Sequence, residues 1–184
     1  MILELILLMS FSESWRTTKP VSDLDQPRPP KSRILNWLRA WWPALLWAVL
    51  ISVLSTDSFS SDNTSSVIEP IFRWLFPHIT QDTVDLLHHL VRKSAHFIEY
   101  FVFSLLLYHG MRASHKDDRP WHWSWAMVAW VIAALYSAFD EIHQIFVPSR
   151  GPSVWDSLLD STGALFALVV LFFLYRRYIR TRPC

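Results

Sequence analysis

The sequence predicts an all-α integral membrane protein with four transmembrane helices and a short interfacial helix in the first outer loop. Three observations predict this fold. Hydrophobic residues make up 52% of the 184-residue chain. Four apolar segments are each close to the length of about twenty residues that crosses a bilayer as a helix. Many of the eleven tryptophans cluster in the first and third segments, as is typical of side chains at a membrane–water interface.

The composition also excludes several classes of function. Three glycines are too few for the glycine-rich loops that bind phosphates. A formal net charge of +1 gives no reason to expect a nucleic-acid partner. The single cysteine, Cys184, rules out an intramolecular disulfide bond and a cysteine-based zinc site. The partner that the composition does predict is the lipid bilayer.

The chain is expected to consist of a membrane domain between two tails. Residues 1–36 are predicted to form a flexible N-terminal tail, because residues 11–33 are polar and rich in proline. The apolar run at residues 1–10 is too short to span a bilayer and lacks the basic start of a signal peptide. The segment is alternatively an extension from a misplaced start codon. We expect the four-helix domain at residues 37–176 and a cytoplasmic basic tail at residues 177–184.

The four spans are predicted at residues 37–54, 95–111, 121–147 and 154–175. The helix of the second span is expected to begin earlier, near Thr80, outside the hydrocarbon. Pro148 ends the third span. Between the first two spans, residues 67–77 combine apolar side chains with Glu69 and Arg73. This mixture predicts a helix that lies along the membrane surface.

The placement of lysine and arginine predicts the orientation. With both termini in the cytoplasm, thirteen of the 17 Lys and Arg residues lie on the cytoplasmic side and four lie outside. The chain is therefore predicted to be N-in and C-in. This topology brings the start of the second span, the end of the third and the start of the fourth to the outer face.

Polar side chains on three helices arrive at this outer level. Spacings of three or four residues place side chains on one helix face. The second helix carries Asp85, His88, His89, Arg92, His96 and Glu99, with Lys93 and Tyr100 beside them. The third carries Tyr136, Asp140, Glu141 and Gln144, and the fourth carries Asp156 and Asp160. We expect His96 or Glu99 to lie within side-chain reach of the two acids of the third helix, with Asp160 near the same centre.

Ionisable groups inside a membrane are energetically costly, so these residues are candidates for a functional site. His96 beside Glu99 has the arrangement of a general base oriented by a carboxylate. Asp140 and Glu141 are the other candidate catalytic residues. His96 and the carboxylates could also hold a divalent cation, although no HExxH or comparable spacing is present.

Two basic residues near these acids suggest a binding role. Lys93 and Arg150 are expected to hold a phosphate or carboxylate group, such as an anionic lipid headgroup or a peptide terminus. The further candidate substrate-binding residues are Tyr100, Gln144, Asp156 and Asp160.

A purely structural interpretation stays open. In it, Arg150 and Lys93 are counter-charges of Asp140 and Glu99. Asp156 would then cap the last helix, because a serine three residues earlier gives the spacing of a capping box. Polar residues also hold membrane helices together without any chemistry.

Three blocks of this sequence resemble the VanZ-like family. They are Lys93-x-x-His96-Phe97-x-x-Tyr100, Asp140-Glu141-x-x-Gln144-x-Phe146-x-Pro148-x-Arg150 and Asp156-x-x-x-Asp160-x-x-Gly163. The resemblance covers about residues 40–175. It implies a small multi-pass protein of the bacterial inner membrane, in a family whose name-giving member is associated with low-level resistance to the glycopeptide teicoplanin. The long N-terminal tail and first outer loop of this chain depart from the family pattern.

The residues and the resemblance together suggest three functions. The first is a protein that binds or modifies cell-envelope groups, such as lipid-linked or peptidoglycan precursors, at the outer face. The second is a membrane-embedded, metal-assisted hydrolase or transferase acting on a lipid-linked substrate. The third is a structural helix bundle that assists a partner complex.

Overall fold

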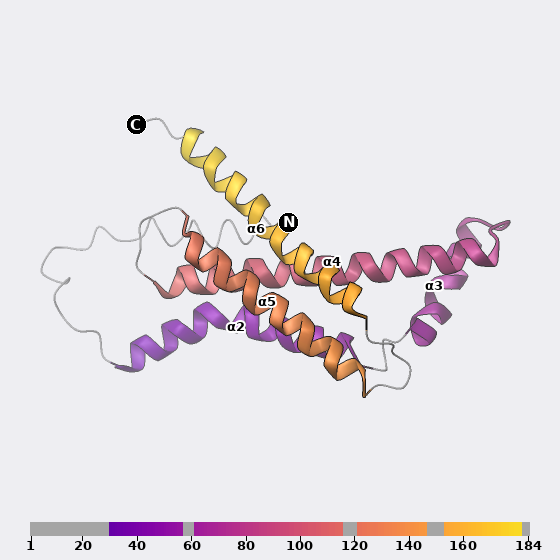
Figure 1. The fold of residues 1–184 in the computed structure, drawn as a ribbon, viewed down its shortest axis with the longest axis horizontal. Helices are drawn as coiled ribbons and strands as arrows, with labels where there is room; N and C mark the ends of the chain where they lie inside the picture. Colours follow the sequence, from indigo (N-terminus) through magenta and orange to yellow (C-terminus); the bar gives the residue numbers. More distant parts are fainter. Residues whose placement is uncertain (1–29, 57–60, 116–120, 147–152, 182–184) are drawn as a thin grey trace, which may run out of the picture.

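A computed structural model of the chain describes residues 30–56, 61–115, 121–146 and 153–181. This part of the chain is helical and contains no strand, which confirms the predicted all-α class. Its helices are α2 (Pro30–Leu54), α3 (Ser61–Leu75), α4 (Gln81–Ser114), α5 (Trp123–Gln144) and α6 (Val154–Thr181) (Figure 1). Pro148, Arg150 and most of the two predicted tails lie outside the described residues.

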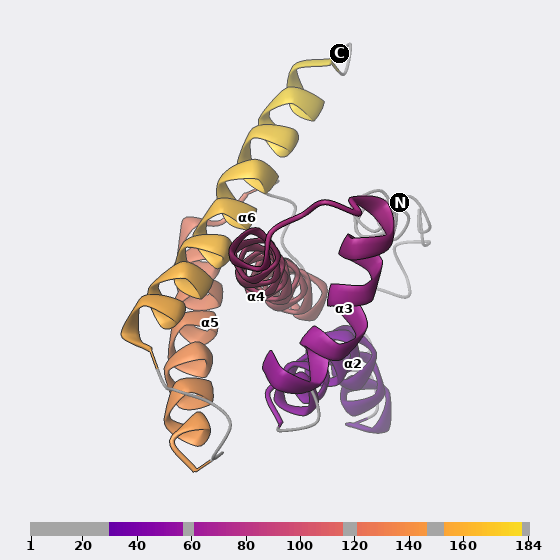
Figure 2. The same ribbon diagram turned by 90° about the vertical axis from the view of Figure 1, so that its right-hand side faces the viewer.

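The helix α4 is the centre of the bundle. Figure 2 looks along α4 and shows it between α2 on one side and α5 and α6 on the other. Tyr100, Phe103 and Tyr108 of α4 are buried in one core with Ala164 and Ala167 of α6. Alanines at a helix contact allow two backbones to approach closely, as is common between membrane helices.

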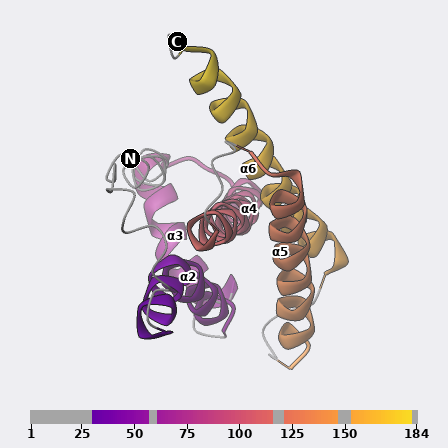
Figure 3. The ribbon, with the colours of Figure 1, turned by 90° about the vertical axis from the view of Figure 1, so that its left-hand side faces the viewer.

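Four chain segments meet at one end of this bundle. Figure 1 shows the end of α2, the end of α5 and the start of α6 on the same side, next to the middle of α4. Figure 3 views the opposite end, where the last part of α6 projects beyond the other helices. The first half of α4 extends past the shared end, and α3 accompanies it there (Figure 1).

Three helices in the described part of the chain are long and apolar enough to cross a membrane. They are Ile34–Leu54, Trp123–Gln144 and Val154–Ile179, with mean hydropathies of 1.5, 1.3 and 2.1. α4 does not qualify, because its first half is polar and its second half carries Glu99, His109 and Arg112 among apolar residues. The predicted second span at residues 95–111, and with it the four-span count, therefore stays a prediction.

Helix boundaries differ from the prediction in places. α4 begins at Gln81 after Thr80, close to the predicted start. α2 begins at Pro30 rather than at residue 37; a proline fits the first turn because the N–H that it lacks would have no helical partner there. α6 continues to Thr181, beyond the predicted end at residue 175.

The interfacial segment is a helix, α3, that is longer than predicted. It starts at Ser61, before the predicted start at residue 67, and continues through Pro70. Arg73 pairs with Glu69 at 2.9 Å, so the two charges in the apolar segment offset each other. Trp74 is 82% exposed, as expected of a side chain facing lipid headgroups. The location of α3 on the membrane surface stays a prediction.

The predicted orientation has a direct chemical test. Cys184 is the only cysteine in the chain, so it is a unique label site at the C-terminus. A membrane-impermeant maleimide is expected to label Cys184 only after the cells are permeabilised. Labelling in intact cells would show that the C-terminus is outside.

Candidate polar site at the membrane end of the bundle

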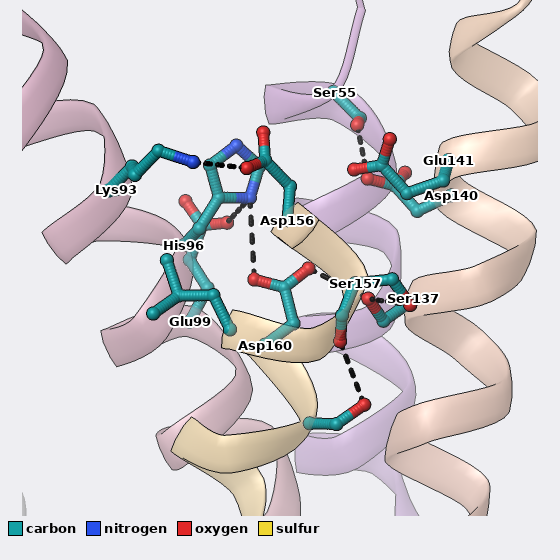
Figure 4. A network of polar contacts seen from close by, with 12 residues as sticks. Ser55, Lys93, His96, Glu99, Ser137, Asp140, Glu141, Asp156, Ser157 and Asp160 are labelled. Carbon is teal, nitrogen blue, oxygen red and sulfur yellow. Dashed lines mark hydrogen bonds and ion pairs between the residues drawn. The ribbon is translucent and has the colours of Figure 1, made fainter. Parts of the chain in front are cut away.

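Asp160 is the most buried acid of the site. It lies on α6 between α4 and α5, and only 1% of its surface is exposed. Its Oδ2 accepts a hydrogen bond of 2.8 Å from the Ser137 hydroxyl of α5. Its Oδ1 accepts no hydrogen bond and lies 3.8 Å from His96 Nδ1. Figure 4 shows the two carboxylate oxygens directed at these different partners.

His96 faces two carboxylates. The i, i+3 spacing places His96 and Glu99 on one face of α4, where His96 Nδ1 lies 3.9 Å from Glu99 Oε2. The same nitrogen is 3.8 Å from Asp160 Oδ1. The side chain of His96 is 12% exposed, and that of Glu99 is 18% exposed. His96 therefore lies between a buried acid and a partly exposed acid.

An ion pair forms the outer edge of the site. Lys93 Nζ of α4 contacts Asp156 Oδ1 in the first turn of α6. The side chains are 32% and 17% exposed. The structural interpretation expected Lys93 to balance Glu99, but its ion-pair partner is Asp156. Exposure thus falls inward, from this pair through His96 and Glu99 to Asp160 (Figure 4).

Asp140 belongs to a second group of polar contacts, between α5 and α2. Its Oδ2 accepts hydrogen bonds from the Ser55 hydroxyl at 2.5 Å and from Gln144 Nε2 at 3.0 Å. Gln144 also donates to Ser55 at 3.1 Å. All three residues are buried. Buried polar groups are costly unless they are hydrogen-bonded, and this closed triangle satisfies that need.

Glu141 holds the start of α6. Its Oε2 accepts a hydrogen bond of 2.7 Å from the backbone N–H of Ser153, directly before the helix. In the capping box considered for Asp156, the acid would bond that N–H itself. Here Glu141, which lies on α5, accepts the hydrogen bond of the Ser153 N–H, and the Asp156 carboxylate contacts Lys93 instead.

Two residues bring the groups together. Tyr100 is fully buried and lies within electrostatic range of both Asp140 and Asp160. Gly163 lies so close to α4 that a Cβ atom there would be 2.5 Å from the backbone oxygen of Phe97. This close approach lies one helical turn after Asp160 and one residue after His96, so it sets their separation.

Comparison with known proteins identifies the family of the chain. The family model VanZ/LLP1 matches residues 32–175, which is most of the chain. The chain belongs to the VanZ/LLP1 family. No curated protein and no solved structure shows a significant match to it. The VanZ/LLP1 match includes all ten residues that the sequence proposes for the site.

Nine of those ten residues are described in this VanZ/LLP1 chain, and they lie at one end of the bundle. Arg150 lies outside the described residues, so its proposed roles are untested. Asp160 is near His96, as predicted. A direct contact of His96 or Glu99 with the acids of α5 stays a prediction. Within the described residues, no group of three or more His, Cys, Asp or Glu side chains has an arrangement that could hold a metal ion.

The sequence interpretation missed the serines of the site and the contribution of α2. Ser137 bonds Asp160 and also Ser157, at 3.2 Å. Ser55 bonds Asp140 from the end of the first span. A signal was present in each case. Ser137 precedes Asp140 by three residues, and Ser55 ends a span that reaches the same membrane face in the predicted topology.

Proposed function

We propose that this VanZ/LLP1 chain binds a polar group of a cell-envelope component, such as a lipid-linked or peptidoglycan precursor, at the outer face of the bacterial inner membrane. One observation carries the proposal. Asp160 is buried within an apolar helix, and one of its carboxylate oxygens has no hydrogen-bond donor. An intramembrane acid is retained at considerable energetic cost, and such acids commonly mark binding sites.

The surrounding contacts support a binding site more than a structural network. A structural network is stable when each buried polar atom has a partner. The Asp140 group comes closer to this condition, because Asp140 Oδ2 accepts hydrogen bonds from both Ser55 and Gln144, and Gln144 also donates to Ser55. Asp160 Oδ1 does not meet it, and it faces the more exposed His96 and Glu99. A ligand group that donates a hydrogen bond to Asp160 Oδ1 would therefore stabilise the site most.

The proposal is tested by comparing cells with and without the protein. Deletion is expected to change the amount or composition of a membrane lipid or a lipid-linked precursor, and the unmodified gene is expected to restore it. We further propose that this binding contributes to glycopeptide resistance, so susceptibility to teicoplanin is measured in the same strains. Unchanged lipids, precursors and susceptibility in the deletion strain would contradict the proposed function.

A second candidate function is hydrolysis or group transfer on a lipid-linked substrate. The observation that favours it is the position of His96 Nδ1, 3.9 Å from Glu99 and 3.8 Å from Asp160. A carboxylate at one imidazole nitrogen orients the ring for general-base catalysis at the other. The distances are longer than hydrogen bonds, and catalytic contacts are often long before substrate binds. Turnover of a bound precursor by purified protein would favour this function over binding alone.

A further inference from the structure

The described residues of the polar site carry more acidic than basic side chains. Asp160 lies within electrostatic range of three other carboxylates, those of Glu99, Asp140 and Glu141. Among the described residues, the cations near the cluster are Lys93, which pairs with Asp156, and Arg92, which is in range of Glu141. In the described part of the site, acids therefore outnumber fixed cations, and the imbalance is greatest around Asp160.

This imbalance argues against an anion as the main ligand. The sequence suggested that Lys93 would clamp a phosphate or carboxylate, but its ammonium contacts the Asp156 carboxylate. A phosphate moving inward past this pair would meet Glu99 and Asp160, and like charges repel strongly where water is scarce. A positive ligand group would be attracted along the same route.

Asp160 supplies the second, independent observation. Its side chain is 1% exposed, and its Oδ1 is directed at His96 and has no hydrogen-bond donor. A buried carboxylate oxygen is stabilised by a donor that carries positive charge. A primary ammonium has three N–H donors. The Lys93–Asp156 contact at the rim shows that the site already accommodates this group.

We propose that the site recognises a primary ammonium group carried by a lipid headgroup, with Asp160 Oδ1 and the Glu99 carboxylate as its acceptors. This inference rests on the proposed function and names the ligand class of the same site. The lipid is the favoured source because the site lies near the ends of the apolar helices α5 and α6. A headgroup there reaches inward from the membrane edge, past Lys93 and Asp156.

The test compares two lipids that differ only in the ammonium group. The purified full-length chain is incubated with mixed micelles containing equal amounts of phosphatidylethanolamine and phosphatidylcholine with identical acyl chains. The second lipid carries a quaternary ammonium, which has no N–H donor. Native mass spectrometry then measures which lipid stays bound. The wild-type chain is expected to retain phosphatidylethanolamine about tenfold over the bulk ratio, because a hydrogen bond to a charged group contributes at least that much.

Two site variants and one control accompany the measurement. Asp160→Asn removes the buried charge. Glu99→Gln removes the more exposed charge, and it is expected to disturb folding less for that reason. Both are expected to reduce the enrichment to the bulk ratio. Asp82→Asn, at an exposed position in the first turn of α4, is expected to leave it unchanged. Soluble glycerophosphoethanolamine is added as a competitor. Displacement of the lipid shows that the headgroup suffices, and absence of displacement shows that the acyl chains are also required.

Three results would overturn the inference. The first is retention of both lipids in the bulk ratio by the wild-type chain, as expected if a proton neutralises Asp160. The second is unchanged enrichment in both Asp160→Asn and Glu99→Gln. The third comes from a parallel incubation in which phosphatidylglycerol replaces phosphatidylcholine. A preference for this anionic lipid would overturn the ammonium inference and would leave the proposed envelope-binding function standing. That function fails separately, if the deletion strain has normal lipids, precursors and glycopeptide susceptibility.

Discussion

Replacing Gly163 with alanine is expected to destabilise the protein by about 3 kcal/mol, at the upper end of the range for overpacked sites. The added Cβ would lie 2.5 Å from the backbone oxygen of Phe97 and 3.2 Å from its ring. A backbone oxygen within a helix cannot turn aside, so α4 and α6 must separate. We expect a lowering of the melting temperature by about 6–12 °C in detergent, measured by the loss of helical circular dichroism.

Gly110 is the matched control for this substitution. A Cβ there would meet ring atoms of Trp41 at 3.1 Å and the backbone oxygen of Ala40 at 3.4 Å. The first obstacle is a side chain, which can shift by a few tenths of an ångström. Gly110→Ala is therefore expected to lower the melting temperature by less than half as much. Equal effects at both positions would show that the α4–α6 approach at Gly163 has no special importance.

Helical spacing was sufficient to predict much of this site. Side chains three or four apart on α4, α5 and α6 lie on the faces that meet, because α-helices repeat every 3.6 residues. The alternation of inside and outside loops then predicted which helix ends come together. His96 and Asp160 are 64 positions apart in the chain, and the structure brings them within 3.8 Å.

The pairing within the site could not be predicted in the same way. Which acid faces Lys93 depends on the rotation of α4 against α6, and the small residues at their contact determine this rotation. The triangle of Ser55, Asp140 and Gln144 depends on α2, because Ser55 directly follows the last residue of this helix. Hydropathy also could not decide whether α4 crosses the membrane, because Lys93, His96 and Glu99 interrupt its apolar residues and lower its mean hydropathy.

Replacing Asp160 with asparagine is expected to abolish the envelope phenotype that the protein confers, while its abundance in the membrane stays at the wild-type level. Asparagine preserves the size of the side chain, and its amide oxygen can still accept the hydrogen bond of the Ser137 hydroxyl. Only the negative charge that faces His96 is lost. Lipid and precursor composition, glycopeptide susceptibility and an immunoblot of the membrane fraction provide the readouts.

Asp140→Asn extends this test to the neighbouring group. Its amide oxygen can still accept from Ser55 and Gln144, so the triangle is expected to survive and the protein to remain abundant. A loss of phenotype in this variant would show that the site needs both negative charges. The exposed change Asp82→Asn is expected to affect neither abundance nor phenotype.

A structural role for Asp160 makes the opposite prediction. Removing one partner of a buried ion pair costs about 3–5 kcal/mol, because the remaining charge is left without its partner. In that case Asp160→Asn would lower the abundance of the protein. The second change His96→Gln would remove the imidazolium charge that Asp160 no longer balances, and it would restore the abundance. Coupling of this kind between two contacting residues is measurable as non-additivity of their separate effects. Abundant Asp160→Asn protein with a normal phenotype would contradict the binding site itself, since the buried charge would then have no role in the function.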